Sequence, residues 1–154
     1  MRVLFLDIDG VLNRRGTRER CGPWIGVDQE LADLLLSWLN TTDIKIVLSS
    51  TWRLHPEMFE HLEVAGIKWI GITPDLAEFG QGLWNAAQRG DEIKRYLGAH
   101  GEIERYAIID DYEDMLPEQQ PYFVRTNDRH GITPDDIEKL KAIYAEAAAD
   151  MESE

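Results

Sequence analysis

Two pairs of aspartates, each placed after a short apolar run, are the residues in this sequence whose types and spacing could do chemistry. Asp7 and Asp9 follow the first run, and Asp110 and Asp111 follow another run much later in the chain. Both runs are continuously apolar, which predicts strands that are covered on both faces of a parallel sheet and that end at one common edge. Carboxylates gathered at that edge repel one another and raise their own pKa values unless a divalent cation compensates them. The two pairs therefore predict carboxylate chemistry on a cation-bound substrate.

The available ligand types favour Mg²⁺ as that cation. Mg²⁺ takes oxygen ligands, keeps some of its waters and shares a substrate phosphate, whereas Zn²⁺ prefers His or Cys. The chain has one cysteine and four histidines, none of them at ligand spacing: Cys21, His55, His61, His100 and His130. The alternative to a metal site at the first pair is an Asp-rich turn before Gly10, because Asp and Gly are common in turns. Two acids that leave a buried strand are costly without a cation or a partner, which favours the metal site.

Strand and helix patterns alternate along the chain. Beyond the two runs before the aspartates, apolar runs predict strands at 44–48, 67–72 and 122–124. Apolar residues at helical spacing predict four helices, of which the first is capped by Asp28 and the last is opened by Pro134. This alternation indicates an α/β fold, a Rossmann-like parallel sheet with helices on both faces.

Length, cysteine content and charge limit the class of protein. The 154 residues suit a single domain, expected over 1–150, with an acidic, alanine-rich end at 145–154 that is expected to fray. One cysteine forms no internal disulfide, no stretch has the length of an apolar membrane span, and the sequence begins in a strand without a signal peptide. A cytoplasmic location without membrane contact is therefore expected. The net charge of −13 argues against non-specific coating of nucleic acid, which depends on a positive surface.

The segment 13–27 differs in composition from the rest of this acidic chain. It contains four arginines and a tryptophan, which are Arg14, Arg15, Arg18, Arg20 and Trp24. One interpretation is a solvated loop or hairpin whose charges balance nearby acids. The other is a basic flap beside a phosphate site, with Trp24 stacking on a base. Trp52 and Arg53 would extend that surface, although a tryptophan is commonly a core residue.

Five stretches resemble motifs of the haloacid dehalogenase-like (HAD) phosphatase superfamily. They are Phe5-Leu6-Asp7-Ile8-Asp9-Gly10-Val11-Leu12-Asn13, Leu48-Ser49-Ser50-Thr51-Trp52-Arg53, Ile70-Gly71-Ile72-Thr73-Pro74, Arg89-Gly90-Asp91-Glu92-Ile93 and Ile109-Asp110-Asp111. Together they are similar to a narrower group, the HAD domain of the Swiss Army Knife RNA repair proteins. The resemblance implies a minimal cap domain or none, and hence an open site, because the segments 13–27 and 73–89 are short.

The resemblance also implies roles for the aspartates. Asp7 is the nucleophile, and Asp9 is the general acid and base, whose presence favours phosphoryl transfer over dehalogenation. Mg²⁺ is held by Asp7, the backbone carbonyl of Asp9 and Asp110, with Asp111 bound directly or through water.

Hydroxyls and a cation complete the implied site. Ser49 donates to the phosphoryl group with Ser50 beside it, although hydroxyls after a strand are, taken alone, typical of a helix N-cap or turn. Arg89 or Lys94 offsets the negative charge. Arg89 is favoured because it grips phosphate with two parallel bonds, whereas Lys94 suits a solvated helix face. The residues expected to contact the rest of the substrate are Ser50, Arg53, Arg14, Arg15, Arg18 and Trp24.

These implications predict a Mg²⁺-dependent phosphomonoesterase with an aspartyl-phosphate intermediate. The arginine-rich flap, the uncapped site and the narrower resemblance favour a nucleic-acid terminal phosphate as the substrate. A phosphatase for small metabolites, with the flap as a lid, is one alternative. A non-catalytic module that binds phosphate or metal is the other, and the intact nucleophile and acid pair disfavour it.

Overall fold

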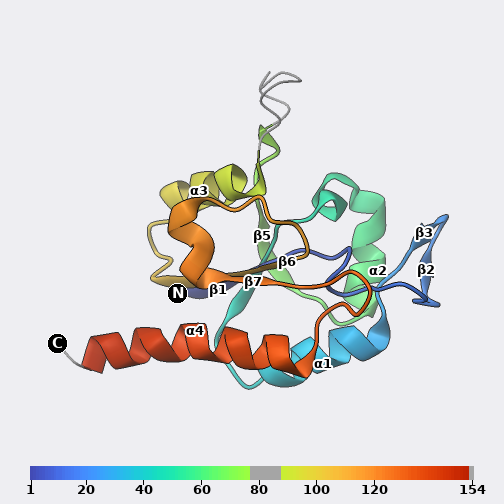
Figure 1. Cartoon of the computed structure of the whole chain (residues 1–154). Helices are drawn as coiled ribbons and strands as arrows, with labels where there is room; N and C mark the ends of the chain where they lie inside the picture. The colour runs from blue at the N-terminus through green and yellow to red at the C-terminus, as the bar shows by residue number, and fades with distance from the viewer. Residues whose placement is uncertain (77–87, 153–154) are drawn as a thin grey trace.

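A five-stranded parallel sheet forms the centre of the computed structural model, which describes residues 1–76 and 88–152 (Figure 1). The strands lie in the order β5-β4-β1-β6-β7, and every neighbouring pair is parallel. Their bounds are β1 Arg2–Leu6, β4 Lys45–Leu48, β5 Trp69–Ile72, β6 Arg105–Asp110 and β7 Phe123–Arg125. The Rossmann-like α/β fold predicted from the alternating patterns is therefore confirmed.

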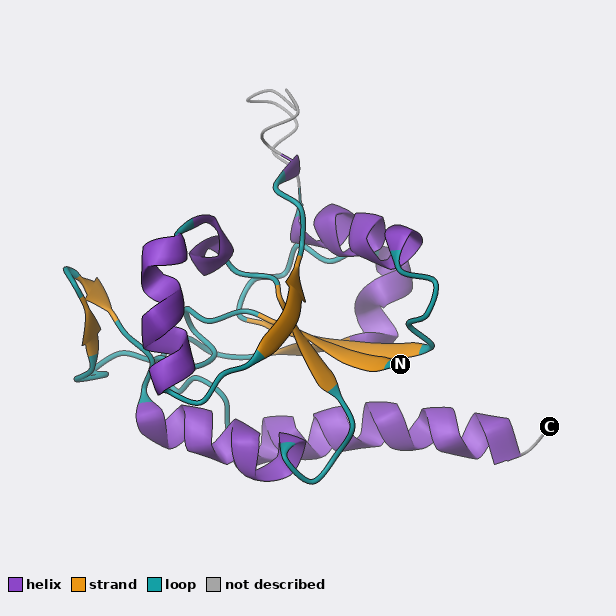
Figure 2. Cartoon of the chain, turned by 180° about the vertical axis from the view of Figure 1, so that it is seen from behind, coloured by secondary structure: helices purple, strands orange, loops and turns teal. Residues whose placement is uncertain are grey.

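Helices cover both faces of this sheet, as the two opposite views show (Figures 1 and 2). The α-helices are α1 Gln29–Leu39, α2 Phe59–Val64, α3 Arg89–Ala99 and α4 Pro134–Glu152. Side chains alternate along β1, so Leu4 and Leu6 join a core with α1, α2 and α4, while Val3 and Phe5 join a second core with α3. As predicted, Asp28 caps α1, accepting a bond from the backbone N–H of Glu30 at 3.2 Å.

Short 3₁₀ helices connect several strands and helices. They are η1 Thr51–Leu54 and η2 Pro56–Met58 after β4, and η4 Pro117–Tyr122 before β7. Three predicted strands begin later than expected. The strand expected at 122–124 begins at Phe123 because Tyr122 ends η4, and those expected at 44–48 and 67–72 begin at Lys45 and Trp69.

The arginine-rich segment after β1 forms a small hairpin. It consists of β2 Arg20–Cys21 and β3 Trp24–Ile25, which are antiparallel and stand away from the sheet (Figure 1). Gly22 turns the hairpin with a φ of 60°. At its base, the backbone N–H of Val27 donates to Nε2 of His61 at 2.9 Å. No larger element is inserted between β1 and α1, in agreement with the expected minimal cap.

Two expectations fall on segments that the structure does not describe. Much of the second short segment, 73–89, lies outside the described residues, and so do the side chains of the acidic end beyond Ala145. Among the described helices, none is long and apolar enough to cross a membrane.

Candidate active site

A row of polar residues crosses the carboxyl edge of the sheet. Leu6, the last residue of β1, pairs with Leu48 of β4 and with Ile109 of β6. The residues that follow these three therefore stand side by side: Ser49, Asp7 and Asp110. The backbone N–H of Asp7 donates to the Ile109 carbonyl at 3.1 Å, and that of Ser49 donates to the Leu6 carbonyl at 2.9 Å. The sheet ladder itself thus fixes the positions of these side chains.

Three aspartates form a compact carboxylate cluster in this row. One oxygen each from Asp7, Asp110 and Asp111 lies within 4.8 Å of the others, and Asp7 and Asp110 are buried. Burial, followed by the charge of Asp110, raises the pKa of Asp7 well above its usual range. Burial likewise raises the pKa of Asp110 to about 6. A site of three carboxylate donors can hold a metal ion, and all-oxygen donors are the set that suits Mg²⁺.

The turn after Asp9 packs directly against this cluster. Gly10 has a φ of 80°, and a Cβ added there would lie 2.2 Å from Oδ2 of Asp111. Hydrogen bonds fix both sides of the glycine: its N–H donates to Oδ1 of Asn13 at 2.9 Å, and its carbonyl accepts from Oγ1 of Thr126 at 2.8 Å. The turn therefore requires glycine for its backbone angle and for the space that Asp111 occupies.

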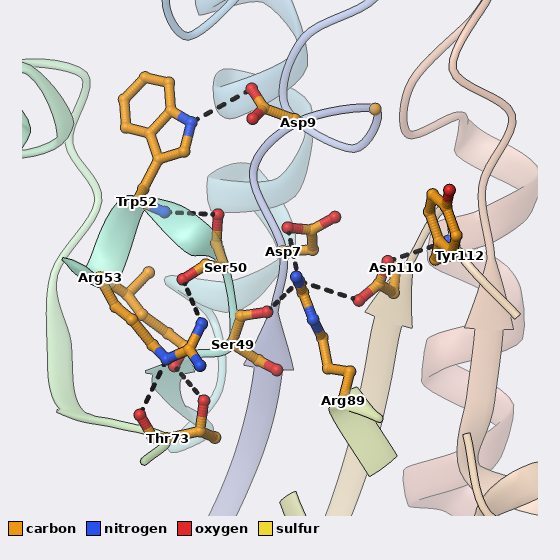
Figure 3. Close-up of polar contacts among 12 residues, drawn as sticks. Asp7, Asp9, Ser49, Ser50, Trp52, Arg53, Thr73, Arg89, Asp110 and Tyr112 are labelled. Carbon is orange, nitrogen blue, oxygen red and sulfur yellow. Dashed lines mark hydrogen bonds and ion pairs between the residues drawn. The ribbon is translucent and has the colours of Figure 1, made fainter. Parts of the chain in front are cut away.

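Arg89, the first residue of α3, directs its guanidinium into the cluster (Figure 3). Its Nη1 donates to Oδ1 of Asp7 at 2.9 Å, to Oδ2 of Asp110 at 3.2 Å and to the carbonyl of Ser49. Burial lowers the pKa of Arg89, but the charges of Asp7 and Asp110 outweigh it and raise the pKa above its usual value. The side chain of Asp114 accepts the backbone N–H of Arg89 at 3.0 Å and so caps the helix. Arg89 is thus a fixed positive charge between two carboxylates.

Lys94, the other candidate cation, lies away from the cluster. Its side chain is 69% exposed and pairs with Glu118 at 3.5 Å on the solvent side of α3. The expectation that Lys94 could serve the phosphoryl group is therefore wrong, because α3 directs the two basic residues to different sides.

Ser49 and Ser50 have different environments. The hydroxyl of Ser49 is buried and has no hydrogen-bond partner among the residues described. A buried hydroxyl left unpaired costs roughly 1–3 kcal/mol, so this oxygen suits a ligand that would pair with it. The hydroxyl of Ser50 accepts the backbone N–H of Trp52 at 3.2 Å and caps η1. Ser50 is fully buried, so the helix-cap alternative applies to it and the expected substrate contact is corrected.

Arg53 does not face the site either. Its side chain is 3% exposed and forms an ion pair with Glu92 of α3 at 2.8 Å. It also donates to the carbonyls of Thr73 at 2.9 Å and Ser50 at 2.7 Å. The expectation that Arg53 contacts substrate is therefore wrong: its guanidinium joins the loops after β4 and β5 to α3.

Asp9 is exposed and is held outside the carboxylate cluster (Figure 3). Its Oδ1 accepts two hydrogen bonds, from Nδ2 of Asn13 at 2.9 Å and from the indole nitrogen of Trp52 at 3.1 Å. Trp52 is otherwise a core residue, 3% exposed. The two aspartates of the first pair thus differ in environment: Asp7 is buried beside a cation and other acids, and Asp9 is accessible with one oxygen restrained.

The flap residues divide into two groups. Arg14 donates to Asp28 at 3.2 Å and to Glu30 at 3.0 Å, so it ties the flap to the start of α1. Arg15 and Arg18 are exposed. Trp24, Arg14 and Arg15 line an open cleft of about 530 Å³ that also borders Asp9, whereas Arg18 is not part of its lining.

Some polar residues near the cluster were given no role from the sequence. They are Asn13, Asp114, Thr126, Arg125 and Arg129. Asn13 lies four residues after Asp9 within the first motif, so this short separation could have indicated its contact with Asp9. The others depend on how β7 and α3 dock beside β6, which sequence spacing does not show.

A comparison with protein-family models identifies the family to which this arrangement of motifs belongs. The model for the HAD domain in Swiss Army Knife RNA repair proteins matches residues 3–137, which include the whole sheet except Arg2 at the start of β1. The chain belongs to this family. As a HAD domain, it is of a phosphatase or hydrolase type, and its row of Asp7, Ser49, Arg89 and Asp110 joins all the motifs that carried the resemblance except the one at β5.

No significant match to this HAD domain was found among curated proteins or among solved structures.

Proposed function

We propose that this HAD domain is a Mg²⁺-dependent phosphomonoesterase that acts through an aspartyl phosphate on Asp7. The observation that carries the proposal is the row itself: buried Asp7 stands between Ser49 and Asp110, and Arg89 is bonded to both acids. The hydroxyl of Ser49 has no hydrogen-bond partner among the described residues. That arrangement provides a nucleophile, a donor for a phosphoryl oxygen and a fixed positive charge.

Mg²⁺ would be held by Asp7, Asp110, Asp111 and the backbone carbonyl of Asp9. The ion supplies charge neutralisation between the carboxylates and the substrate phosphate. The raised pKa values of Asp7 and Asp110 support this assignment, because two buried acids at this spacing are compensated only in part by Arg89.

The chain's own residues divide the reaction into two displacements. A carboxylate oxygen of Asp7 attacks phosphorus, and the bond from phosphorus to the ester oxygen breaks. Asp9 gives its proton to that leaving oxygen. Asp9 then removes a proton from water, whose oxygen attacks the aspartyl phosphate, releasing inorganic phosphate and restoring both side chains.

The proposed substrate is a terminal phosphate of a nucleic acid. Asp9 is accessible, and the cleft beside it is lined by arginine and tryptophan of the flap. Arginine binds phosphate and tryptophan stacks on bases, and together they suit a nucleotide better than a sugar phosphate. A panel of oligonucleotides phosphorylated at the 5′ or 3′ end, free nucleotides, sugar phosphates and phosphopeptides tests this choice.

Hydrolysis of p-nitrophenyl phosphate tests the chemistry. We expect turnover with Mg²⁺ that is lost in EDTA and in Asp7→Asn, and a phosphorylated intermediate on Asp7 that is trapped by rapid acid quench. Asp33→Asn, an exposed position on α1, is the matched control and should behave as the wild type. Full activity in Asp7→Asn would rule out this mechanism.

A further inference from the structure

The cleft beside Asp9 has an apolar side built from both the flap and the loop after β4. It lies between the β2–β3 hairpin and the 3₁₀ helices η1 and η2. Its apolar lining comprises Trp24, Ile25, Trp52 and Met58. Trp24 is 64% exposed and Ile25 is 42% exposed, although both are large apolar side chains. Exposed tryptophan on a hairpin that borders a catalytic acid is a surface suited to stacking on a planar ring.

The cleft lies on the side of the candidate site where the leaving group of the substrate would lie. Asp9 and Asp111 both line it, so the cleft begins where the carboxylate cluster ends. In an in-line displacement, the leaving oxygen departs opposite Asp7 and must meet the acid that protonates it. The group attached to that oxygen consequently lies on the side of Asp9 that opens into the cleft.

A second groove continues from the first and is polar. Arg15, Asp111 and Asp128 line both, and Arg125 and Arg129 are added in the second. The backbone N–H of Arg15 donates to the carbonyl of Asp128 at 3.2 Å, so the foot of the flap and the loop after β7 are held together. Three arginines from two distant segments therefore gather beside the candidate site.

Two of these arginines have charge available for a ligand. Arg125 donates to the carbonyl of Asp111 and to Glu113, both at 3.2 Å. Arg15 and Arg129 are exposed and form no ion pair with any residue that the structure describes. In a chain of net charge −13, such a group of cations favours an anion at this place.

We propose that the apolar cleft binds the base of the nucleotide that carries the scissile phosphate, and that the basic groove binds the next phosphate along the strand. This inference rests on the proposed function and refines it, because it assigns a polynucleotide end rather than a free nucleotide as the preferred substrate. The stacking surface provides affinity for any base. Arg15 and Arg129 bind the next phosphate, which a strand has and a mononucleotide lacks.

Three phosphate substrates separate the two subsites from the catalytic centre. Acetyl phosphate has no ring, a phosphorylated mononucleoside has a base, and a short single-stranded oligonucleotide with the same terminal phosphate has both a base and a following phosphate. We expect Trp24→Ala to lower kcat/KM for the two nucleotide substrates about tenfold more than for acetyl phosphate. The double variant Arg15→Ala, Arg129→Ala should lower it selectively for the oligonucleotide and reduce its salt slope by roughly 0.7 for each arginine removed.

Matched controls and a binding measurement complete the test. Val64→Ala and Arg95→Ala remove an exposed apolar and an exposed basic residue that line neither groove, and both should match the wild type on all three substrates. Fluorescence anisotropy of a labelled phosphorylated oligonucleotide on catalytically inactive Asp7→Asn should show the same losses of affinity when the subsite substitutions are added.

Each outcome bears on one claim. Absence of turnover of all three substrates in the wild type would reject the proposed function, while anisotropy would still test the two subsites. Equal losses on all three substrates in Trp24→Ala would overturn the stacking assignment. Equal losses on mononucleotide and oligonucleotide in the arginine variant would overturn the groove, and so would equal turnover of a phosphopeptide with the same dependence on Trp24.

Discussion

The indole nitrogen of Trp52 donates a hydrogen bond of 3.1 Å to Oδ1 of Asp9. Asn13 donates to the same oxygen at 2.9 Å, so one carboxylate oxygen is restrained by two donors. In the proposed mechanism, the proton that Asp9 gives and takes is therefore assigned to Oδ2. Both donors act through Asp9, which makes Trp52 and Asn13 positioning residues.

Replacement of Trp52 by Phe should make activity depend on the leaving group. The substitution keeps an aromatic ring in the core but removes the N–H, so Asp9 is less well aligned. We expect kcat for an alkyl phosphate to fall about tenfold, because alkoxide departure needs the proton. The loss should be much smaller for p-nitrophenyl phosphate, whose leaving group is stable without one. Trp69→Phe, away from Asp9, is the control, and equal losses on both substrates would contradict the positioning role.

Replacement of Arg89 should be far more costly than replacement of Lys94. Arg89→Ala removes the donor to Asp7 and Asp110, and we expect kcat/KM to fall by roughly 10²–10³-fold. Arg89→Lys should recover part of this, because the charge is kept and the planar guanidinium geometry is lost. Lys94→Ala should stay within about twofold of the wild type in the same assay, as expected of an exposed surface position. A large loss in Lys94→Ala would contradict the assignment of the cation.

Gly10→Ala should weaken metal binding, while Gly16→Ala should not. Both glycines have positive φ angles, 80° and 88°, so the backbone strain of the two substitutions is similar. A Cβ at position 10 would collide with Oδ2 of Asp111, whereas nothing lies within 4 Å of a Cβ at position 16. Isothermal titration with Mg²⁺ should show a Kd weaker by about tenfold or more in Gly10→Ala alone. Equal affinities would show that Asp111 is not needed for the ion.

The stability of the protein in EDTA should decrease as the pH rises. Asp110 has a pKa of about 6, raised by burial, and the pKa of Asp7 is raised as well. A carboxyl with a raised pKa binds its proton more tightly in the folded state. Its contribution to stability is complete below the pKa of the unfolded state, about 3.9, and is lost as the pH rises through the pKa of the folded state. Chemical denaturation should show a decrease on the order of 1–3 kcal/mol between about pH 4 and 6.

Two measurements check that the carboxylate cluster causes this decrease. Asp110→Asn should weaken the pH dependence in EDTA, because one of the two carboxyls with a raised pKa is gone and its charge no longer raises the pKa of Asp7. Saturating Mg²⁺ should restore stability at neutral pH in the wild type and much less in Asp110→Asn. A wild-type profile in EDTA that rises over the same interval would contradict the pKa shifts.

Removal of Arg53 should destabilise the fold strongly. Arg53→Ala leaves Glu92 buried without its cation, for which a cost of about 3–5 kcal/mol is expected in urea unfolding. The double variant Arg53→Met, Glu92→Gln removes both charges and should cost less than the single variant. If Arg53→Ala instead lowered kcat/KM at unchanged stability, Arg53 would have to act on substrate.

The positions of the carboxylates could be predicted from the sequence because a single physical rule places them. Apolar runs that are buried on both faces become neighbouring parallel strands, and the polar residue that follows each run lies at the shared edge. Asp7, Ser49 and Asp110 satisfy this rule, and their alignment in register is what the structure shows. The helices on both faces follow from the same alternation of patterns.

Side-chain direction after the strands could not be predicted in the same way. Ser49 and Ser50 are adjacent in sequence, yet one hydroxyl is unpaired among the described residues and the other caps η1. Arg53 resembles a surface cation until α3 brings Glu92 against it. Trp52 is a core residue, yet its indole nitrogen donates a hydrogen bond to Asp9. From the sequence, Trp52 is either a core residue or part of the substrate surface, and neither alternative includes this contact.

The placement of Asp7 and Asp110 on paired strands has a kinetic consequence for folding. The two carboxylates come together only when β1 pairs with β6, a contact between distant parts of the chain that forms slowly. An unfolded chain therefore offers the ion no preformed site, and a bound cation would slow unfolding much more than it would speed folding. The like charges of the two acids oppose this strand pairing when both are ionised, and Arg89, which bonds both, or a bound cation would relieve that repulsion.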